Sequence, residues 1–153
     1  MRGPLLDRLP PALLDVPYVG SRHPGSAAVA ARPDLAAGAN CQVYAYAVLR
    51  HFGLAPPALR SGELWADTGT TVRVTRPRPL DLALFAPSHD PYGAHVGVWA
   101  GEDRVLHLCA EAGRPAVWGL EEFAARERYR VLIGSKRVIR TESVEVFGGS
   151  SDR

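Results

Sequence analysis

One run of helix-forming, mostly apolar residues limits the folds that this chain can adopt. Residues 41–52 contain no proline or glycine, and large apolar side chains cover a broad face of the helix that they predict. Gly53 is a suitable C-cap, and two prolines at 56 and 57 prevent the helix from continuing. The later segments are mostly short and rich in β-branched residues. This order predicts an α+β fold in which one buried helix packs on a central antiparallel sheet of about five strands.

The remaining elements follow from the alternation of apolar residues and from turn residues. Strands are predicted for 71–75, 80–86, 94–100, 104–109 and 129–139, with 115–118 as a shorter candidate. The last strand is expected to be broken or bulged near Gly134. Short helices are predicted for 57–65 and 120–128, helical turns for 5–16, and a long loop for 21–39.

The length of the chain predicts a single domain. The chain has 153 residues, of which 46% are hydrophobic and 22% are charged, as in ordinary globular proteins. We expect one domain over residues 1–140 and a partly flexible C-terminal tail over 141–153. The net charge of +2 and the absence of a Lys/Arg cluster argue against a nucleic-acid or membrane-surface partner.

The N-terminus and the cysteine count bear on location. Residues 1–11 contain no uninterrupted apolar stretch of the kind found in signal peptides, and no run approaches the length of a membrane span. Two cysteines do not make a disulfide scaffold. The expectation is a reducing, cytoplasmic location, with export by a secretion apparatus or another non-classical route left open.

Cys41 is the first candidate catalytic residue. Asn40 is a good N-cap, so Cys41 falls at the start of the predicted helix, where free backbone N–H groups and the helix dipole favour negative charge. Such an environment lowers the pKa of a thiol and favours the nucleophilic thiolate. The plainer alternative is a small buried hydrophobic residue.

Two histidines supply the other half of the candidate site. A turn at 101–103 folds the strand that begins near His95 against the strand that carries His107, so the two imidazoles can meet on one face. One ring can then accept a proton from a thiol while the other holds it in the correct tautomer. Cys109 shares a face with His107, which suggests a packed neighbour of the site.

Several segments resemble, in order, the motifs of the NlpC-type family of bacterial cell-wall cysteine peptidases, a compact branch of the papain-like fold. The matching segments are Val16-Pro17-Tyr18-Val19-Gly20, Asn40-Cys41-Gln42, residues 79–85, Ala94-His95-Val96-Gly97-Val98-Trp99 and Val105-Leu106-His107. The resemblance runs from about Leu13 to Ile139. It is most specific around His95, whose strand carries a family-like glycine.

The resemblance implies a cysteine peptidase or amidase. Cys41 would be the nucleophile, His95 the general base and His107 the residue that orients the base. Tyr18 would lie near the nucleophile, and Asn40 and Gln42 would contact substrate.

The expected substrate is a small peptide or muropeptide, and no cofactor or metal is expected. The family has an acidic residue before the cysteine and a serine after it, so the residues found here leave the substrate open. Recycling of muropeptides, a delivered toxin with an immunity partner, and a biosynthetic pathway with its own partner protein all fit.

Three alternatives remain from the sequence. His107 and Cys109 could bind metal with His95 or His89, but no usual ligand spacing accompanies them. The chain could also be an inactive binding module, or an acyltransferase that uses the same acyl-enzyme.

The other notable side chains receive no catalytic role. His51 suits the helix C-terminus, and Asp81 is expected to bind loop backbone. His23 and His89 fall in loops. Trp65, Trp99 and Trp118 are expected in the core or at its rim.

Overall fold

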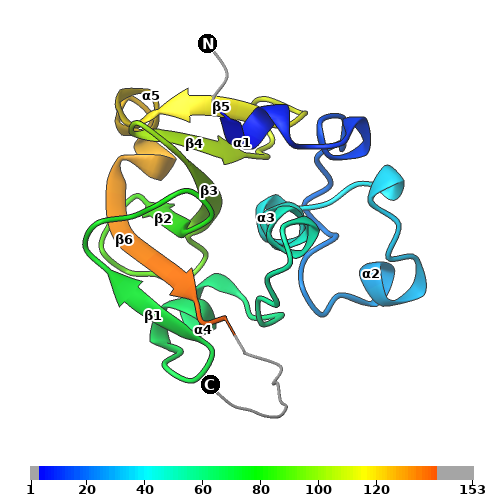
Figure 1. Cartoon of the computed structure of the whole chain (residues 1–153), viewed down its shortest axis with the longest axis horizontal. Coiled ribbons are helices and arrows are strands. Elements are labelled where there is room, and N and C mark those ends of the chain that lie inside the picture. The colour runs from blue at the N-terminus through cyan, green and yellow to red at the C-terminus, as the bar shows by residue number, and fades with distance from the viewer. Residues whose placement is uncertain (1–3, 141–153) are drawn as a thin grey trace.

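The computed structural model describes residues 4–140, so the predicted tail over 141–153 lies outside the described residues. One sheet curves around helix α3 (Cys41–His51), which packs mainly against strand β3 (His95–Gly101) (Figure 1). None of the helices within 4–140 is long and apolar enough to cross a membrane. The predicted α+β architecture is therefore confirmed for the described residues.

Helices are few and mostly short. The other α-helices are α1 (Pro4–Asp7), α2 (Ala27–Ala31), α4 (Ser61–Ala66) and α5 (Leu120–Ala124), and the 3-10 turns are η1 (Pro11–Leu13), η2 (Leu35–Ala37) and η3 (Glu127–Tyr129). Helix α3 begins at Cys41 as predicted and ends at His51, one residue before the predicted end, and Gly53 adopts the predicted left-handed conformation, with φ of 88°.

The sheet has six strands, against the predicted number of about five, in the order β1-β6-β2-β3-β4-β5. The other strands are β1 (Thr71–Val74), β2 (Leu82–Ala86), β4 (Arg104–His107), β5 (Ala116–Gly119) and β6 (Val131–Val138). Every neighbouring pair is antiparallel. The extra strand is β5, the short candidate at 115–118.

Apolar clusters cover both faces of the sheet. Leu82, Leu84 and Ala86 belong to the cluster that contains α3, whereas Ala83 and Phe85 belong to a second cluster with Trp99, Trp118 and Phe123. Successive side chains of a strand point to opposite faces, so the two clusters lie on opposite sides of β2. Double coverage explains why β2 is buried throughout and shows little polar alternation.

Several predicted boundaries were wrong. The loop over 21–39 contains α2 and η2, because Ser26 caps α2 by accepting a hydrogen bond from the backbone N–H of Val29. Helix α4 begins only at Ser61, where Glu63 accepts from the backbone N–H of Arg60. The helix predicted over 120–128 is divided into α5 and η3.

Several strand ends also differ by one or two residues from the predicted ranges. Strand β2 starts at Leu82, because the backbone turns at residues 78–81 and the Asp81 N–H donates to the Arg78 carbonyl. Strand β4 ends at His107, so Cys109 lies beyond it.

The irregularity predicted near Gly134 is present. The pairing of β2 with β6 shifts between Leu84 and Phe85, which face Gly134 and Leu132. A Cβ atom at Gly134 would come within 2.5 Å of the Trp65 ring, so the glycine lets this half-buried tryptophan pack against the sheet.

Gly97 lies where β3 and β4 leave no room for a side chain. A Cβ atom at this position would lie 2.4 Å from Cγ1 of Val105 and 3.2 Å from Cβ of His107. The Leu106 carbonyl, a backbone group of β4, is also 3.2 Å away, and the Val105 methyl group belongs to a stiff β-branched side chain, so neither moves aside easily. A larger residue at this position would therefore push apart the strands that carry His95 and His107.

We expect Gly97→Ala to lower the free energy of unfolding by about 1–3 kcal/mol, because the added methyl group overpacks the β3–β4 contact. Urea denaturation measures this change. Gly62→Ala is the matched control: Gly62 lies in α4, its nearest neighbour to an added Cβ is 3.8 Å away, and alanine favours a helix. Equal stabilities for the two variants would contradict the role assigned to Gly97.

Candidate active site

Cys41 is the first residue of α3, as predicted, and its side chain is half-buried. The Asn40 side chain caps the helix by accepting a hydrogen bond of 2.9 Å from the backbone N–H of Val43. Cys41 lines a cleft of about 400 Å³ together with Tyr18 and His95. The fold thus brings together residues that are far apart in the sequence.

Burial changes the pKa of the Cys41 thiol more strongly than the N-terminus of α3 does. Burial raises its pKa to about 11, and the backbone N–H groups of Val96, Gln42 and Cys41 itself oppose that rise only in part. The prediction of a lowered thiol pKa was therefore wrong in its net direction. The sequence shows where the helix begins, but it does not show how strongly the surrounding elements desolvate the thiol.

His95 and His107 form the predicted pair. Nε2 of His95 lies 2.9 Å from Nδ1 of His107, and the two ring planes are 86° apart. Both side chains are buried. Their contact leaves Nδ1 of His95 as the ring nitrogen that can take a proton from a nucleophile.

The surroundings of His107 restrict the tautomer that can support this role. If His95 is to accept a proton at Nδ1, its Nε2–H must donate to Nδ1 of His107, and the His107 proton must sit on Nε2. That Nε2 is buried without a polar partner among the described residues. The centroids of the Trp118 and Phe123 rings lie 4.3 and 4.7 Å from the centroid of the His107 ring. An N–H group beside aromatic rings is more easily accommodated there than a bare lone pair.

The two imidazoles resist protonation. Burial lowers the pKa of His95 to about 3, and the positive charge of Arg128 adds to the effect. Burial also lowers the pKa of His107 to about 2, with smaller contributions from His95 and Arg126. Because the thiol pKa is raised and both imidazole pKa values are lowered, the resting site holds a neutral thiol and neutral imidazoles.

The structure assigns different surroundings to the three residues expected to contact substrate. Tyr18 lines the cleft, and burial raises the pKa of its hydroxyl, which therefore stays a hydrogen-bond donor. Asn40 lines the cleft, but its oxygen is used by the helix cap. Gln42 also lines it, yet its amide nitrogen donates to the Leu59 carbonyl at 2.9 Å. That bond makes Gln42 a structural tie to the segment before α4.

Arg22 is a positioning residue that the sequence did not reveal. Its guanidinium is buried and donates to four backbone carbonyls, those of Ala28, Arg32, Asp34 and Gly38. Its own carbonyl accepts from the backbone N–H of Asn40 at 2.9 Å. Arg22 thereby ties the segment 22–38 to the start of α3. An arginine among small residues carries no sequence signal for this role.

The cleft also contains residues that no sequence pattern indicates. The cleft is lined by Arg60 and Ser61 at the start of α4 and by Arg128 and Tyr129 at η3. The Tyr129 ring lies 4.6 Å from that of His95, centroid to centroid. These residues sit at element boundaries without a recognisable motif, so only the fold shows that they face Cys41.

The histidines outside the pair make local contacts. His51 has Nε2 at 3.3 Å from the Arg8 carbonyl, consistent with its predicted structural role. His23 has Nδ1 at 3.3 Å from an Arg60 guanidinium nitrogen. His89 is exposed in a loop and is not among the residues that line the cleft.

The structure also shows the contacts of the cysteine, aspartate and tryptophans that the sequence singled out. Cys109 is buried in the second apolar cluster, beside the site as predicted. Asp81 accepts from the Arg78 backbone N–H, which confirms its predicted loop contact, and also pairs with Arg137. Trp99 and Trp118 are buried and Trp65 is half-buried, as predicted.

Within residues 4–140, no group of three or more His, Cys, Asp or Glu side chains is placed to hold a metal ion.

We expect alkylation of Cys41 by iodoacetamide to rise about tenfold per pH unit up to at least pH 10, because burial places the thiol pKa near 11. Mass spectrometry of a Cys109→Ser variant measures the modification of Cys41 alone. The same variant unfolded in urea is the control, with a midpoint near 8.5. A plateau below pH 9 in the folded protein would show an activated thiolate instead.

We expect the free energy of unfolding to fall as the pH drops from about 6.5 toward 3. The unfolded chain takes up protons on His95 and His107 near pH 6.5, whereas the folded chain keeps both neutral, so acid favours unfolding. His107→Asn removes one of these groups and should reduce the slope of stability against pH in urea titrations. His89→Asn, at an exposed site, should leave the slope unchanged, and equal slopes for both variants would contradict the assignment.

Comparison with solved structures identifies the fold. A crystal structure of an NlpC/P60 family protein from Bacillus cereus ATCC 10987 matches 82% of this chain at 20% identity and a TM-score of 0.56. A protein of the NLP/P60 family, similar to lipoprotein, from Staphylococcus aureus subsp. aureus Mu50 matches 90% at 21% identity and a TM-score of 0.55.

The chain spans only 36% and 41% of those two proteins. No protein-family model and no curated protein matches the sequence. The architecture of this chain is nevertheless that of the NlpC/P60, papain-like proteins.

Proposed function

We propose that this protein is a cysteine-dependent amide hydrolase in which Cys41 forms an acyl-enzyme. His95 acts as the general base and His107 orients it. The observation that supports this proposal best is the 2.9 Å contact between the two imidazoles, one of which lines the same cleft as a cysteine at a helix start. A nucleophile, a base and a group that orients the base are the parts required for acyl transfer.

The Cys41 thiol and the His95 imidazole are both neutral at rest in this proposal, and this determines how the first step proceeds. The Cys41 proton moves to Nδ1 of His95 as the sulfur bonds to the amide carbonyl carbon, since a free thiolate is disfavoured in the buried site. The resulting imidazolium donates through Nε2–H to Nδ1 of His107, which stabilises its charge. The backbone N–H of Cys41 and the Tyr18 hydroxyl are the donors proposed for the oxyanion.

The second half of the cycle returns the proton. His95 gives its proton to the departing amine as the carbon–nitrogen bond breaks and leaves a thioester on Cys41. A water molecule then attacks the thioester, with His95 accepting a water proton. Collapse of the intermediate releases a carboxylic acid and returns a proton to the thiol.

The proposed substrates are small peptides with peptidoglycan-type amide bonds, or related small amides. This choice rests on the resemblance of the segments around Tyr18, Cys41, His95 and His107 to those of cell-wall peptidases, and on the shared fold. The residues on either side of Cys41 differ from that family and supply no acidic group next to the nucleophile. A cytoplasmic site of action and a pathway or immunity partner belong to the same proposal.

We expect the full chain to release new fragments from muropeptides, as read by mass spectrometry, and Cys41→Ala to lower that rate by at least about 10³-fold because the nucleophile is lost. Cys109→Ala is the matched control, since this buried cysteine lies outside the cleft lining and should retain activity. His107→Asn should lower kcat more than it raises KM, because an orienting group acts on the base.

Other outcomes would redirect the proposal. A Cys41-dependent product that carries an added amine or alcohol would show acyl transfer instead of hydrolysis. Unchanged turnover in Cys41→Ala would overturn the proposed role of the thiol.

A further inference from the structure

The cleft around Cys41 is lined by two groups of residues from different parts of the fold. The first group, here called the helix side, consists of Tyr18, Gly20, residues 40–42 at the start of α3 and residues 60–61 at the start of α4. The second group, here called the sheet side, consists of Pro87 after β2, residues 93–95 at the start of β3 and residues 128–129 in η3. An amide that reacts with Cys41 and exchanges protons with His95 lies between these two sides.

Each side contributes one arginine. Arg60 is the N-cap residue of α4 on the helix side, and Arg128 lies in η3 on the sheet side. Both residues are exposed, so a ligand in the cleft can reach their guanidinium groups. One Arg60 nitrogen lies 3.3 Å from Nδ1 of His23, and this imidazole supplies no negative charge. No aspartate or glutamate of residues 4–140 lines the cleft, so its charge is positive.

The carboxylates beside these arginines are engaged by other groups. Glu63 accepts a hydrogen bond of 3.1 Å from the backbone N–H of Arg60. Glu111 pairs with the guanidinium of Arg126 through contacts of 2.8 and 2.7 Å. In the described part of the chain, no carboxylate forms an ion pair with the guanidinium of Arg60 or Arg128. Both groups are therefore available to an anionic ligand.

Arg128 also acts on the proposed general base. Burial is the main cause of the low pKa of His95, and the positive charge of Arg128 adds to it. His95 becomes a positively charged imidazolium in the proposed mechanism, and Arg128 opposes that step unless a negative charge lies beside it. The described residues that line the cleft supply no such charge, whereas a substrate can.

We propose that the substrate carries two carboxylates close to the scissile amide, and that Arg60 and Arg128 are the residues that select it. This inference rests on the proposed function, because it concerns the same cleft. A guanidinium binds a carboxylate through two parallel N–H···O bonds, which gives the selection a defined geometry. An ammonium group at either position is rejected by repulsion, since no carboxylate of the described lining can pair with it.

Alkylation of Cys41 in the Cys109→Ser variant tests the charge preference without any turnover. We compare the rate constants for the anionic reagent iodoacetate and the neutral reagent iodoacetamide at one pH and low ionic strength. Their ratio does not depend on the thiol pKa, because both reagents react with the same thiolate. We expect the ratio to be at least about tenfold higher in the folded protein than in urea, because the cleft attracts the anion.

Substitution of the two arginines identifies the source of that attraction. Arg60→Gln with Arg128→Gln should lower the ratio to its value in urea. Arg60→Lys with Arg128→Lys should keep most of it, because both positive charges remain.

Protection of Cys41 from iodoacetamide identifies the class of ligand. N-succinyl-alanine carries a carboxylate on each side of a small amide, and β-alanyl-alanine has an ammonium group in place of the succinyl carboxylate. We expect N-succinyl-alanine to protect half of the thiol at a concentration at least about tenfold lower than β-alanyl-alanine does. Arg60→Gln with Arg128→Gln should abolish the difference. Equal half-protection concentrations in the wild-type chain, or no protection by either compound, would overturn the proposal.

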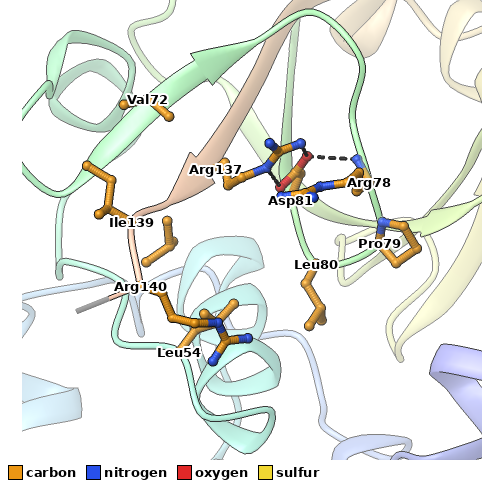
Figure 2. A pocket seen from close by; sticks show the side chains of 10 residues that line it. Leu54, Val72, Arg78, Pro79, Leu80, Asp81, Arg137, Ile139 and Arg140 are labelled. Carbon is orange, nitrogen blue, oxygen red and sulfur yellow. Dashed lines mark hydrogen bonds and ion pairs between the residues drawn. The ribbon is translucent and has the colours of Figure 1, made fainter. Parts of the chain in front are cut away.

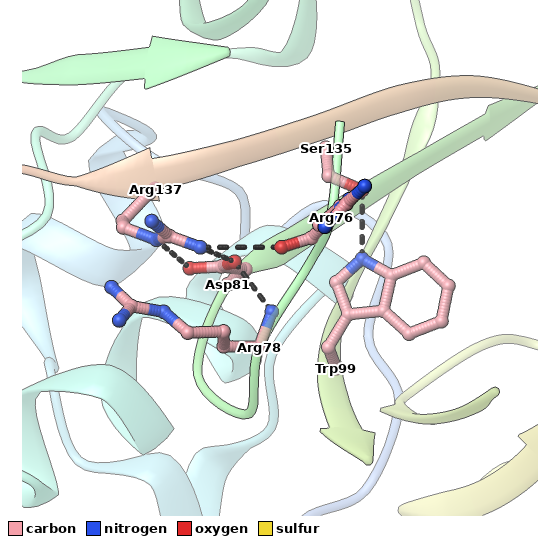
Figure 3. Close-up of polar contacts among 6 residues, drawn as sticks. All are labelled: Arg76, Arg78, Asp81, Trp99, Ser135 and Arg137. Atoms are coloured by element: carbon pink, nitrogen blue, oxygen red, sulfur yellow. Dashed lines mark hydrogen bonds and ion pairs between the residues drawn. The ribbon is translucent and has the colours of Figure 1, made fainter. Parts of the chain in front are cut away.

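A matched control arginine lies in a different hollow of the molecule. That hollow has a volume of about 640 Å³ and is lined by Leu54, Val72, residues 78–81 and residues 137–140 (Figure 2). The backbone N–H of Arg78 donates to Asp81 at 2.7 Å, and Asp81 pairs with Arg137 through two contacts of 2.9 Å (Figure 3). The Arg78 side chain takes no part in these bonds, so Arg78→Gln leaves them in place.

The control separates local charge from net charge. Arg78→Gln with Arg104→Gln removes two positive charges at exposed positions outside the cleft lining and should leave the alkylation ratio unchanged. A ratio that is equal in the folded and unfolded chains would overturn the proposal. An equal fall of the ratio in the control and cleft variants would overturn the assignment to Arg60 and Arg128. Absence of muropeptide hydrolysis would overturn the proposed function alone, because neither assay requires turnover.

Discussion

Burial of the sheet on both faces is the constraint on which this structure depends. Strand β2 contributes Leu82, Leu84 and Ala86 to the cluster around α3, and Ala83 and Phe85 to the cluster on the other side. A strand placed in this way cannot shift its register by one residue without exchanging the two sets of side chains. The neighbouring strand β3 is held to it residue by residue, so His95 takes its place opposite Phe85. The position of His95 in the candidate site is therefore fixed by the packing of the sheet.

The same burial determines the electrostatics of the site. Removing water raises the pKa of Cys41 and lowers those of His95 and His107, so the three groups are neutral at rest. In the proposed reaction, charge would appear only during proton transfer, where the His95–His107 hydrogen bond and the N–H donors at the start of α3 could stabilise it. Arg126 and Arg128 add positive charge near the imidazoles and reinforce their neutrality. This electrostatic setting is the reason why the proposed mechanism couples proton transfer to attack.

Much of the fold was predictable because local patterns and tertiary packing agree. The α3 helix has a cap at Asn40, an apolar face and a glycine end, and each signal identifies the same element. The turn at 101–103 connects two alternating segments, which is sufficient to predict that His95 and His107 meet. The segment before α3 was harder, because its organisation depends on Arg22 and on carbonyls scattered through residues 28–38. Contacts of that kind leave no periodic trace in a sequence.

The sequence by itself determined the fold class, the start of α3 at Cys41 and the pairing of two histidines, because caps, alternation and turn residues act over a few positions. Only the tertiary structure decided the protonation of these groups, since desolvation depends on every element packed around them. It also decided that the amide of Gln42 donates to the Leu59 carbonyl and that Arg60, Arg128 and Tyr129 line the same cleft as Cys41. Short-range signals specify which residues can react, and long-range packing specifies the environment in which they do so.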